Sequence, residues 1–231
     1  MRLIDTHSHL FLEEFSEDFP QVIERARAAG VTHIFMPNID STTIEAMLSA
    51  CSVYKGYCFP MIGLHPTSVN ANYEKELEIV ARELKFSKEY VAIGEIGMDL
   101  YWDKTYLKEQ QIVLDKQVNW ALEYDLPIVI HCRDAFDYIY KVLEPYKKTP
   151  LRGIFHSFTG TAEEAARVLE FSDFFIGING VVTFKKSHLP EILAGIPLEK
   201  IVLETDSPYL TPVPNRGKRN ESAYVKDTLM K

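Results

Sequence analysis

The sequence predicts an α/β fold, a closed parallel (β/α)8 barrel of the TIM type. Short runs of β-branched and apolar residues recur along the chain, and stretches with helical periodicity separate them. The runs lie near residues 2–6, 31–36, 57–63, 90–95, 126–131, 152–156, 173–178 and 200–206. Eight such units in 231 residues fit one barrel. An open doubly wound sheet is the alternative, but two histidines follow the first run where that fold carries a Gly-rich phosphate-binding turn.

Several helices have recognisable boundaries. Ser16 is typical of the N-cap of a helix that runs to Ala29. Residues 105–124 predict a long amphipathic helix, and residues 221–231 read as the beginning of a final one. Capping-box patterns indicate two further helix starts, at Thr42 with Glu45 and at Thr161 with Glu164.

Composition predicts one globular domain over residues 1–231 in the cytoplasm. The chain is 46% hydrophobic, yet no apolar run approaches the roughly 18 residues of a membrane helix. No secretory signal pattern opens it, and its three scattered cysteines suit a reducing compartment. A net charge of -8 argues against an overall basic nucleic-acid binder, although a local basic site stays possible. Without a long heptad pattern, we expect a monomer or a weak oligomer.

Six potential metal ligands fall at the ends of five predicted strands. His7 and His9 are two residues apart, so in a strand both imidazoles project from one face. The other four ligands end later strands, and in such barrels these ends carry the active site. They are Glu95, His131, His156 and Asp206. The set predicts a metal centre, whereas His33 inside a strand and His188 in a polar loop are expected to be structural and solvated, respectively.

At these residues the chain resembles the TatD family of metal-dependent deoxyribonucleases. The resemblance spans nearly the whole chain, in order. Its segments are Asp-Thr-His-Ser-His at 5–9, Gly-Glu-Ile-Gly-Met-Asp at 94–99, His-Cys-Arg-Asp at 131–134, His-Ser-Phe at 156–158 and Glu-Thr-Asp-Ser-Pro at 204–208. It implies an amidohydrolase-type barrel that cleaves DNA phosphodiesters, chiefly as a 3′ to 5′ exonuclease on single-stranded ends.

The resemblance also implies two divalent metal ions. One would be held by His7, His9 and Asp206, and the second by His131 and His156, with Glu95 as the bridge between them. Two cations about 3.5–4 Å apart repel each other, so a shared carboxylate is chemically reasonable. The expected catalytic residues are Glu95 as the bridge and Asp206, which can also accept a proton from the attacking water. Imidazole and carboxylate ligands suit Mg, Mn or Zn, among others.

Further residues are candidates for substrate binding or for orienting ligands. His65 matches a Gly-Leu-His-Pro segment of the family, and we expect it to contact a substrate phosphate rather than only to hydrogen-bond its loop. We expect Arg133 to bind a phosphate with its planar guanidinium, the alternative being a surface ion pair with Asp134 or a neighbouring loop. Tyr101 with its neighbour Trp102, and Phe158, would either stack on unpaired bases or close the barrel mouth. Two carboxylates one layer deeper are expected to orient the ligands, Asp5 and Glu204.

Charge placement suggests a basic rim around the expected site. Six cationic side chains follow the fifth, seventh and eighth strands, and solvated loop residues are an equally good interpretation. They are Arg133, Lys185, Lys186, Arg216, Lys218 and Arg219. Family members generally continue through a further helix or two that cover the seam between strands eight and one, so the last helix here is expected to be incomplete. Either the chain is truncated or the seam is closed in another way.

Three classes of function remain open. The favoured one is a metal-dependent DNase. The second is another ester or amide hydrolase, such as a D-aminoacyl-tRNA deacylase, which needs only the same activated water. The third is a non-catalytic metal or nucleic-acid binding module, which a complete ligand set disfavours.

Overall fold

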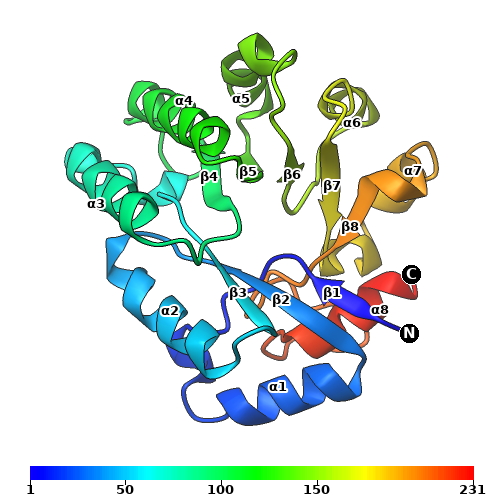
Figure 1. Ribbon diagram of the computed structural model, residues 1–231. Helices are drawn as coiled ribbons and strands as arrows, with labels where there is room; N and C mark the ends of the chain where they lie inside the picture. The colour runs from blue at the N-terminus through cyan, green and yellow to red at the C-terminus, as the bar shows by residue number, and fades with distance from the viewer.

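Eight parallel strands form the centre of the computed structural model, which describes residues 1–231 (Figure 1). Each strand except the last leads through a helix to the next. The strands are β1 (Leu3–Asp5), β2 (Val31–Pro37), β3 (Cys58–Met61), β4 (Ile93–Asp99), β5 (Ile128–Arg133), β6 (Gly153–Phe155), β7 (Phe174–Ile178) and β8 (Ile201–Leu203).

The strands pair in two parallel groups, β1-β2-β3 and β4-β5-β6-β7-β8, and backbone contacts join the groups at both edges. At one edge Ile62 bridges to Ile93, and the Gly94 N–H donates to the Ile62 carbonyl at 2.9 Å. At the other edge Ser8 bridges to Ser207. The ring is therefore closed, which confirms the predicted barrel over the open sheet.

An outer ring of helices covers the strands (Figure 1). The helices are α1 (Phe19–Ala28), α2 (Ile44–Val53), α3 (Tyr73–Phe86), α4 (Leu107–Glu123), α5 (Phe136–Leu143), α6 (Ala162–Val168), α7 (Leu189–Leu193) and α8 (Val225–Leu229). Short 3-10 segments lie at Glu13–Phe15, Ser41–Thr43, Pro66–Ser68, Glu144–Tyr146, Gly180–Thr183, Leu198–Lys200 and Ser222–Tyr224. The main buried cluster contains side chains from β1 through β7 and from the helices that surround the barrel. None of the helices is long and apolar enough to cross a membrane.

Two of the three predicted helix starts were wrong. The first helix begins at Phe19, not after Ser16, because Pro20 has no N–H and is tolerated only in the first turn. At the second start Asp40 caps the 3-10 turn Ser41–Thr43 and accepts the Thr42 N–H at 3.0 Å, while α2 itself begins at Ile44 after Thr43. Thr161 and Glu164 form the predicted capping box.

The segment after β8 covers the seam between β8 and β1, so the seam is closed even though the final helix is short. The short helix α8 contacts both β1 and β8, and its Val225 is fully buried in the main cluster. Just before it, the Glu221 carboxylate accepts hydrogen bonds from the Arg25 guanidinium of α1 at 2.6–3.0 Å. The two chain ends consequently lie near each other in Figure 1.

Candidate metal centre

The six predicted ligands converge at the end of the barrel where the strands finish. His7 and His9 follow β1, His131 belongs to β5, His156 follows β6 and Asp206 follows β8. Glu95 lies in the third position of β4, because this strand runs to Asp99 and not, as predicted, to Glu95. His7, His9, Glu95 and His156 are all at most 4% exposed. The closed ring thus brings residues nearly 200 positions apart into one polar cluster inside an apolar core.

The carboxylate of Glu95 lies at the centre of this cluster. Its Oε2 is 3.0 Å from His7 Nε2 and 3.6 Å from His9 Nε2. Its Oε1 is 2.9 Å from His131 Nδ1 and 3.7 Å from His156 Nε2. The two oxygens therefore face different imidazoles, Oε2 those of His7 and His9 and Oε1 those of His131 and His156, with His65 also near Oε1. A carboxylate shared by two cations requires such an arrangement.

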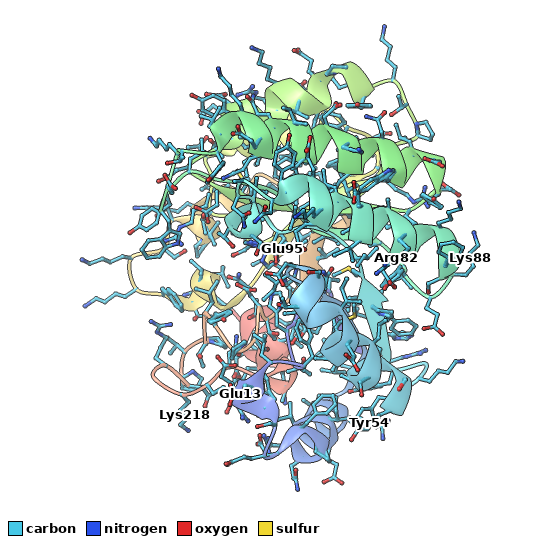
Figure 2. The ribbon with its side chains drawn as sticks, turned by 90° about the vertical axis from the view of Figure 1, so that its left-hand side faces the viewer. Glu13, Tyr54, Arg82, Lys88, Glu95 and Lys218 are labelled. Carbon is cyan, nitrogen blue, oxygen red and sulfur yellow. The ribbon has the colours of Figure 1, made fainter.

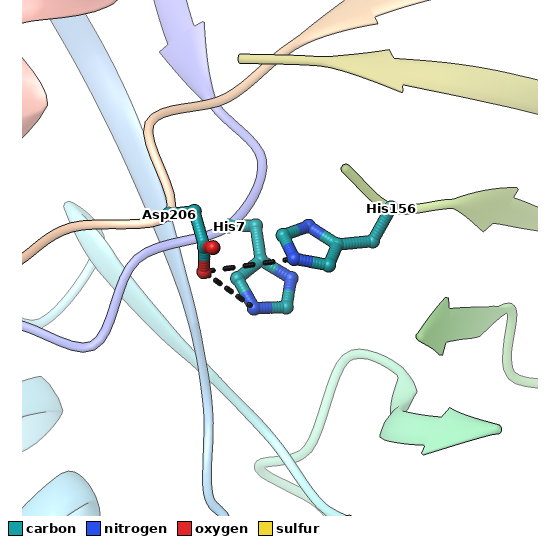
Figure 3. A group of neighbouring side chains, drawn as sticks. All are labelled: His7, His156 and Asp206. Atoms are coloured by element: carbon teal, nitrogen blue, oxygen red, sulfur yellow. Dashed lines mark ion pairs between the residues drawn. The ribbon is translucent and has the colours of Figure 1, made fainter. Parts of the chain in front are cut away.

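The Asp206 carboxylate faces the imidazoles of His7 and His156 (Figure 3), and its side chain is 16% exposed. Its Oδ1 is 3.8 Å from His7 Nε2, 3.7 Å from His9 Nε2 and 3.6 Å from His156 Nε2. It is thus as near to His156 as to the two histidines after β1, and the geometry does not restrict it to one of the two groups.

Three of the imidazoles are held from behind by acceptors. His131 Nε2 lies 3.0 Å from Asp99 Oδ2, His156 Nδ1 lies 3.0 Å from Glu204 Oε1, and His9 Nδ1 lies 3.3 Å from the Pro37 carbonyl oxygen. Carboxylates and carbonyls only accept, so the outer nitrogen carries a proton, and the inner nitrogen can give its lone pair to a metal ion once it has released its own proton. This donor set fits divalent metal ions such as Zn²⁺ or Mn²⁺.

The pKa shifts in the cluster also indicate a site for positive charge. Burial acts to raise the pKa of Glu95, but the imidazoles of His7, His65 and His156 hold it well below its usual range. Burial acts to lower the pKa of His131, but Asp99 and Glu95 raise it to about 9. The pKa of His156 reaches about 10 because Glu204 and Asp206 outweigh the same burial effect. The cluster therefore holds positive charge among its carboxylates, either as protons or as bound cations.

Backbone features around the site explain why these side chains can approach so closely. Gly97 has a φ of 139°, and a Cβ built there would lie 2.0 Å from the His131 carbonyl oxygen. At Gly177 a Cβ would lie 2.6 Å from the Glu204 carboxylate. Ser157 and Asp206 have φ values of 48° and 58°, a left-handed conformation that is uncommon outside glycine and concentrates at functional sites.

Asp5 and Glu204 lie behind the cluster as expected, but they act differently. Glu204 faces an imidazole directly, whereas Asp5 accepts the Thr205 N–H at 2.9 Å and the Thr205 hydroxyl at 2.6 Å. Asp5 thereby fixes β1 to the loop that carries Asp206. Its own pKa is raised to about 7 by complete burial.

His65 was expected to contact only substrate, but it lies close enough to contact the cluster itself. Its Nε2 is 3.4 Å from Glu95 Oε1. The Thr67 N–H donates to its Nδ1 at 3.2 Å, so the neutral ring carries its proton on Nε2, toward the site. His65 thus presents a hydrogen-bond donor to the cluster and not a lone pair.

The other candidate substrate residues differ in their exposure. The Arg133 guanidinium lies over the Tyr101 ring, 3.7 Å from its centre, and Tyr101 is 53% exposed. Phe158 is only 6% exposed and lines a cleft of about 330 Å³ beside His156, between the loops after β5 and β6. Little of the Phe158 ring face is therefore open for stacking.

The predicted basic rim is only partly present. Arg219 is bound by Asp18, with its Nη1 2.8 Å from Oδ1, and lies over the Phe15 ring, while Arg216 packs on Phe184. Both form structural contacts across the fold. Three lysines remain exposed, namely Lys185, Lys186 and Lys218. Of the two isolated histidines, His188 is 83% exposed, as expected, and His33 stacks on the Phe59 ring with 5.4 Å between centres.

Sequence reasoning assigned no role to Asp99, although this carboxylate holds His131. The signal was available, because Glu95, Gly97 and Asp99 alternate along one strand and so share a face. The error came from ending the strand at Glu95.

The chain matches the family model described as TatD related DNase over residues 4–231. It is 39% identical to the uncharacterized metal-dependent hydrolase YabD of Bacillus subtilis, over 97% of this chain and 87% of that protein. It is 34% identical to the 3′-5′ ssDNA/RNA exonuclease TatD of Pantoea sp., over 96% and 87%. The crystal structure of YjjV, a TatD homologue from Escherichia coli K12, superposes with a TM-score of 0.92 at 29% identity, covering 99% of this chain and 88% of that one.

Proposed function

The chain belongs to the family of TatD-related DNases and is a metal-dependent hydrolase; from this premise we propose that it shortens single-stranded DNA from the 3′ end. One observation carries the proposal. The inner nitrogens of four histidines converge on the two oxygens of a single buried carboxylate, Glu95. The Pantoea relative named as an exonuclease supports the choice of substrate.

We propose two divalent metal ions, Mg, Mn or Zn, one on each side of Glu95. His7 and His9 would hold the first, and His131 and His156 the second, with Asp206 as a further ligand. Such cations would lower the pKa of a bound water toward neutrality and would offset the negative charge of the phosphate.

The protein side chains supply positioning and proton transfer. Oδ1 of Asp206 faces the imidazoles, which leaves Oδ2 to accept the proton of the attacking water. The Nε2–H of His65 is directed at the site and can donate to a non-bridging phosphate oxygen. Arg133 would bind the same phosphate or the next one. The three cysteines are free, in keeping with a reducing, cytoplasmic setting.

The test is digestion of a 5′-labelled single-stranded oligonucleotide with Mg²⁺ or Mn²⁺, with chelator, and with the Glu95→Gln variant, which keeps the shape of the side chain and removes its charge. We expect a ladder that shortens from the 3′ end, and its loss with chelator and in the variant. Parallel incubation with D-aminoacyl-tRNA separates the alternatives. Release of the aminoacyl group without chain shortening would replace the nuclease by a deacylase, and an intact oligonucleotide in every metal would refute the nuclease.

A further inference from the structure

Two exposed aromatic rings on the loop after β4 form a cluster with an arginine at the end of β5, beside the metal centre. Tyr101 is 53% exposed and Trp102 is 73% exposed. Their rings meet edge to face, with 4.8 Å between centres and 89° between planes. The Arg133 guanidinium lies 3.7 Å from the centre of the Tyr101 ring and 5.3 Å from that of Trp102. We call Tyr101, Trp102 and Arg133 the aromatic platform.

The way Arg133 is held leaves its hydrogen-bonding capacity free. Arg219 and Arg167 are bound by the carboxylates of Asp18 and Asp137, respectively, so their N–H donors are engaged within the fold. Arg133 forms no ion pair, not even with its neighbour Asp134, and is held by the faces of aromatic rings. Stacking fixes the guanidinium plane while its N–H donors stay available, which is the state required to bind a phosphate.

The platform is fixed to the metal centre through one carboxylate. The Tyr101 N–H donates to Asp99 Oδ1 at 3.1 Å, and Oδ2 of the same group lies 3.0 Å from His131 Nε2. The Leu100 N–H donates to the Arg133 carbonyl at 3.0 Å, which joins the loop to β5. A ligand on the platform is therefore held at a set distance from Glu95.

Exposure of Trp102 has no explanation within the fold. Large aromatic side chains usually bury most of their surface, and 73% exposure of a Trp beside a polar site indicates a surface that a ligand covers. A chemically matched ligand has a flat apolar face next to an anionic group. An unpaired nucleotide has both.

We propose that the aromatic platform binds a nucleotide adjacent to the one being removed, with its base stacked on Trp102 and its phosphate on Arg133. In a duplex both faces of each internal base are covered by neighbours, so this contact favours single-stranded ends. The platform would thus determine strand preference for the reaction at Glu95. The proposal rests on the proposed function only in taking the substrate to be nucleic acid.

The binding test uses Trp102 as its own probe. The chain has two tryptophans, so the Trp120→Phe variant reports on Trp102 alone. With chelator present to prevent cleavage, addition of oligothymidylate should quench its fluorescence. An oligonucleotide with abasic residues keeps the phosphates and removes the bases, and it should quench much less. Equal quenching by the two oligonucleotides, or none by either, would overturn the proposal.

The kinetic test compares Trp102→Ala with Trp102→Phe and with a matched control. Phe86 is 77% exposed at the end of α3, near Lys85, whose Nζ lies 5.5 Å from the ring. It therefore has the same kind of cation–aromatic contact, but α3 runs back to the other end of the barrel, the end where Lys88 lies in Figure 2, opposite Lys218.

We expect Trp102→Ala to raise KM for single-stranded DNA about 5- to 10-fold, at the low end of measured stacking effects, because one face of the ring stays exposed to solvent. The Trp102→Phe variant should have a KM close to that of the parent, and Phe86→Ala should leave KM unchanged. The KM of the abasic oligonucleotide should not respond to Trp102→Ala. If active enzyme shows no change in Trp102→Ala, or the same change with abasic substrate, the platform is wrong and the nuclease stands. If no nuclease activity is found but base-dependent quenching persists, the platform stands and the proposed function is wrong.

Discussion

Replacement of Asp99 by Asn should weaken metal binding at the His131 side of the cluster without changing the fold. Oδ1 of Asp99 accepts the Tyr101 N–H, and Oδ2 faces His131 Nε2 at 3.0 Å. An Asn that keeps the first contact turns its NH₂ group toward His131. The ring must then accept at Nε2 and carry its proton on Nδ1, which lies 2.9 Å from Glu95 Oε1. The lone pair that faces the metal site is lost.

The size of the effect follows from the contact that is removed. Loss of a group that orients a metal-bound histidine typically costs 10- to 100-fold in affinity, or about 1.4–2.7 kcal/mol. We expect the upper part of this range, because the substitution also reverses the tautomer. The first metal, on the side of His7 and His9, should bind as before.

The assay is a competition of the protein with a fluorescent zinc chelator, which resolves two binding steps. Asp103→Asn is the matched control, because this carboxylate lies on the same loop and hydrogen-bonds only Thr105. Nuclease activity should fall in parallel with occupancy of the weaker step and recover at high metal concentration. Unchanged affinity for both metals in Asp99→Asn would refute the assigned role of His131.

Three further predictions follow. Metal binding at neutral pH should release about two protons, because the pKa values of His131 and His156 near 9 and 10 keep both rings protonated without metal. Metal affinity should therefore rise as the pH rises toward 9. Calorimetry in buffers of different ionisation enthalpy measures the proton release, and its absence would contradict this prediction. Asp18→Asn should cost about 1 kcal/mol of unfolding free energy at pH 7, a value reduced by partial exposure of the pair. The Arg219 guanidinium lowers the pKa of Asp18 to about 2, so this contribution is complete above the unfolded pKa near 3.9 and is lost as the pH falls toward 2; a difference in urea midpoint that persists at pH 2 would count against it. Gly97→Ala should lower the free energy of unfolding by about 3 kcal/mol, because the added Cβ would lie 2.0 Å from the His131 carbonyl oxygen. A urea midpoint equal to the parent's would contradict this, because it would mean that β4 and β5 move apart at no cost in stability.

The fold and the inner cluster were predictable because both depend on local patterns repeated along the chain. Each strand places alternate residues on one face, and a closed parallel ring brings all strand ends together. His7, His9 and Glu95 could thus be expected in one place without knowledge of any contact. The pattern fixes which residues meet, and the distances from Glu95 Oε1 and Oε2 come only from the structure.

Features that depend on contacts between distant segments were not predictable in the same way. Arg219 was expected on a basic rim, but Asp18, some 200 residues earlier, binds it instead. The seam is covered by Val225, and no local pattern shows that a helix of five residues packs there. The role of Asp99, in contrast, depends on a local pattern, and a correct prediction of where β4 ends would have revealed it.

The central claim is that Glu95 lies between two cations, and anomalous diffraction from crystals loaded with Mn²⁺ tests it most directly. We expect two anomalous peaks, one beside each oxygen of Glu95, with His7 and His9 at the first and His131 and His156 at the second. The Glu95→Gln variant should lose at least one of them. A single peak in the parent protein, or two peaks that Glu95 does not contact, would show that Glu95 does not bridge two cations.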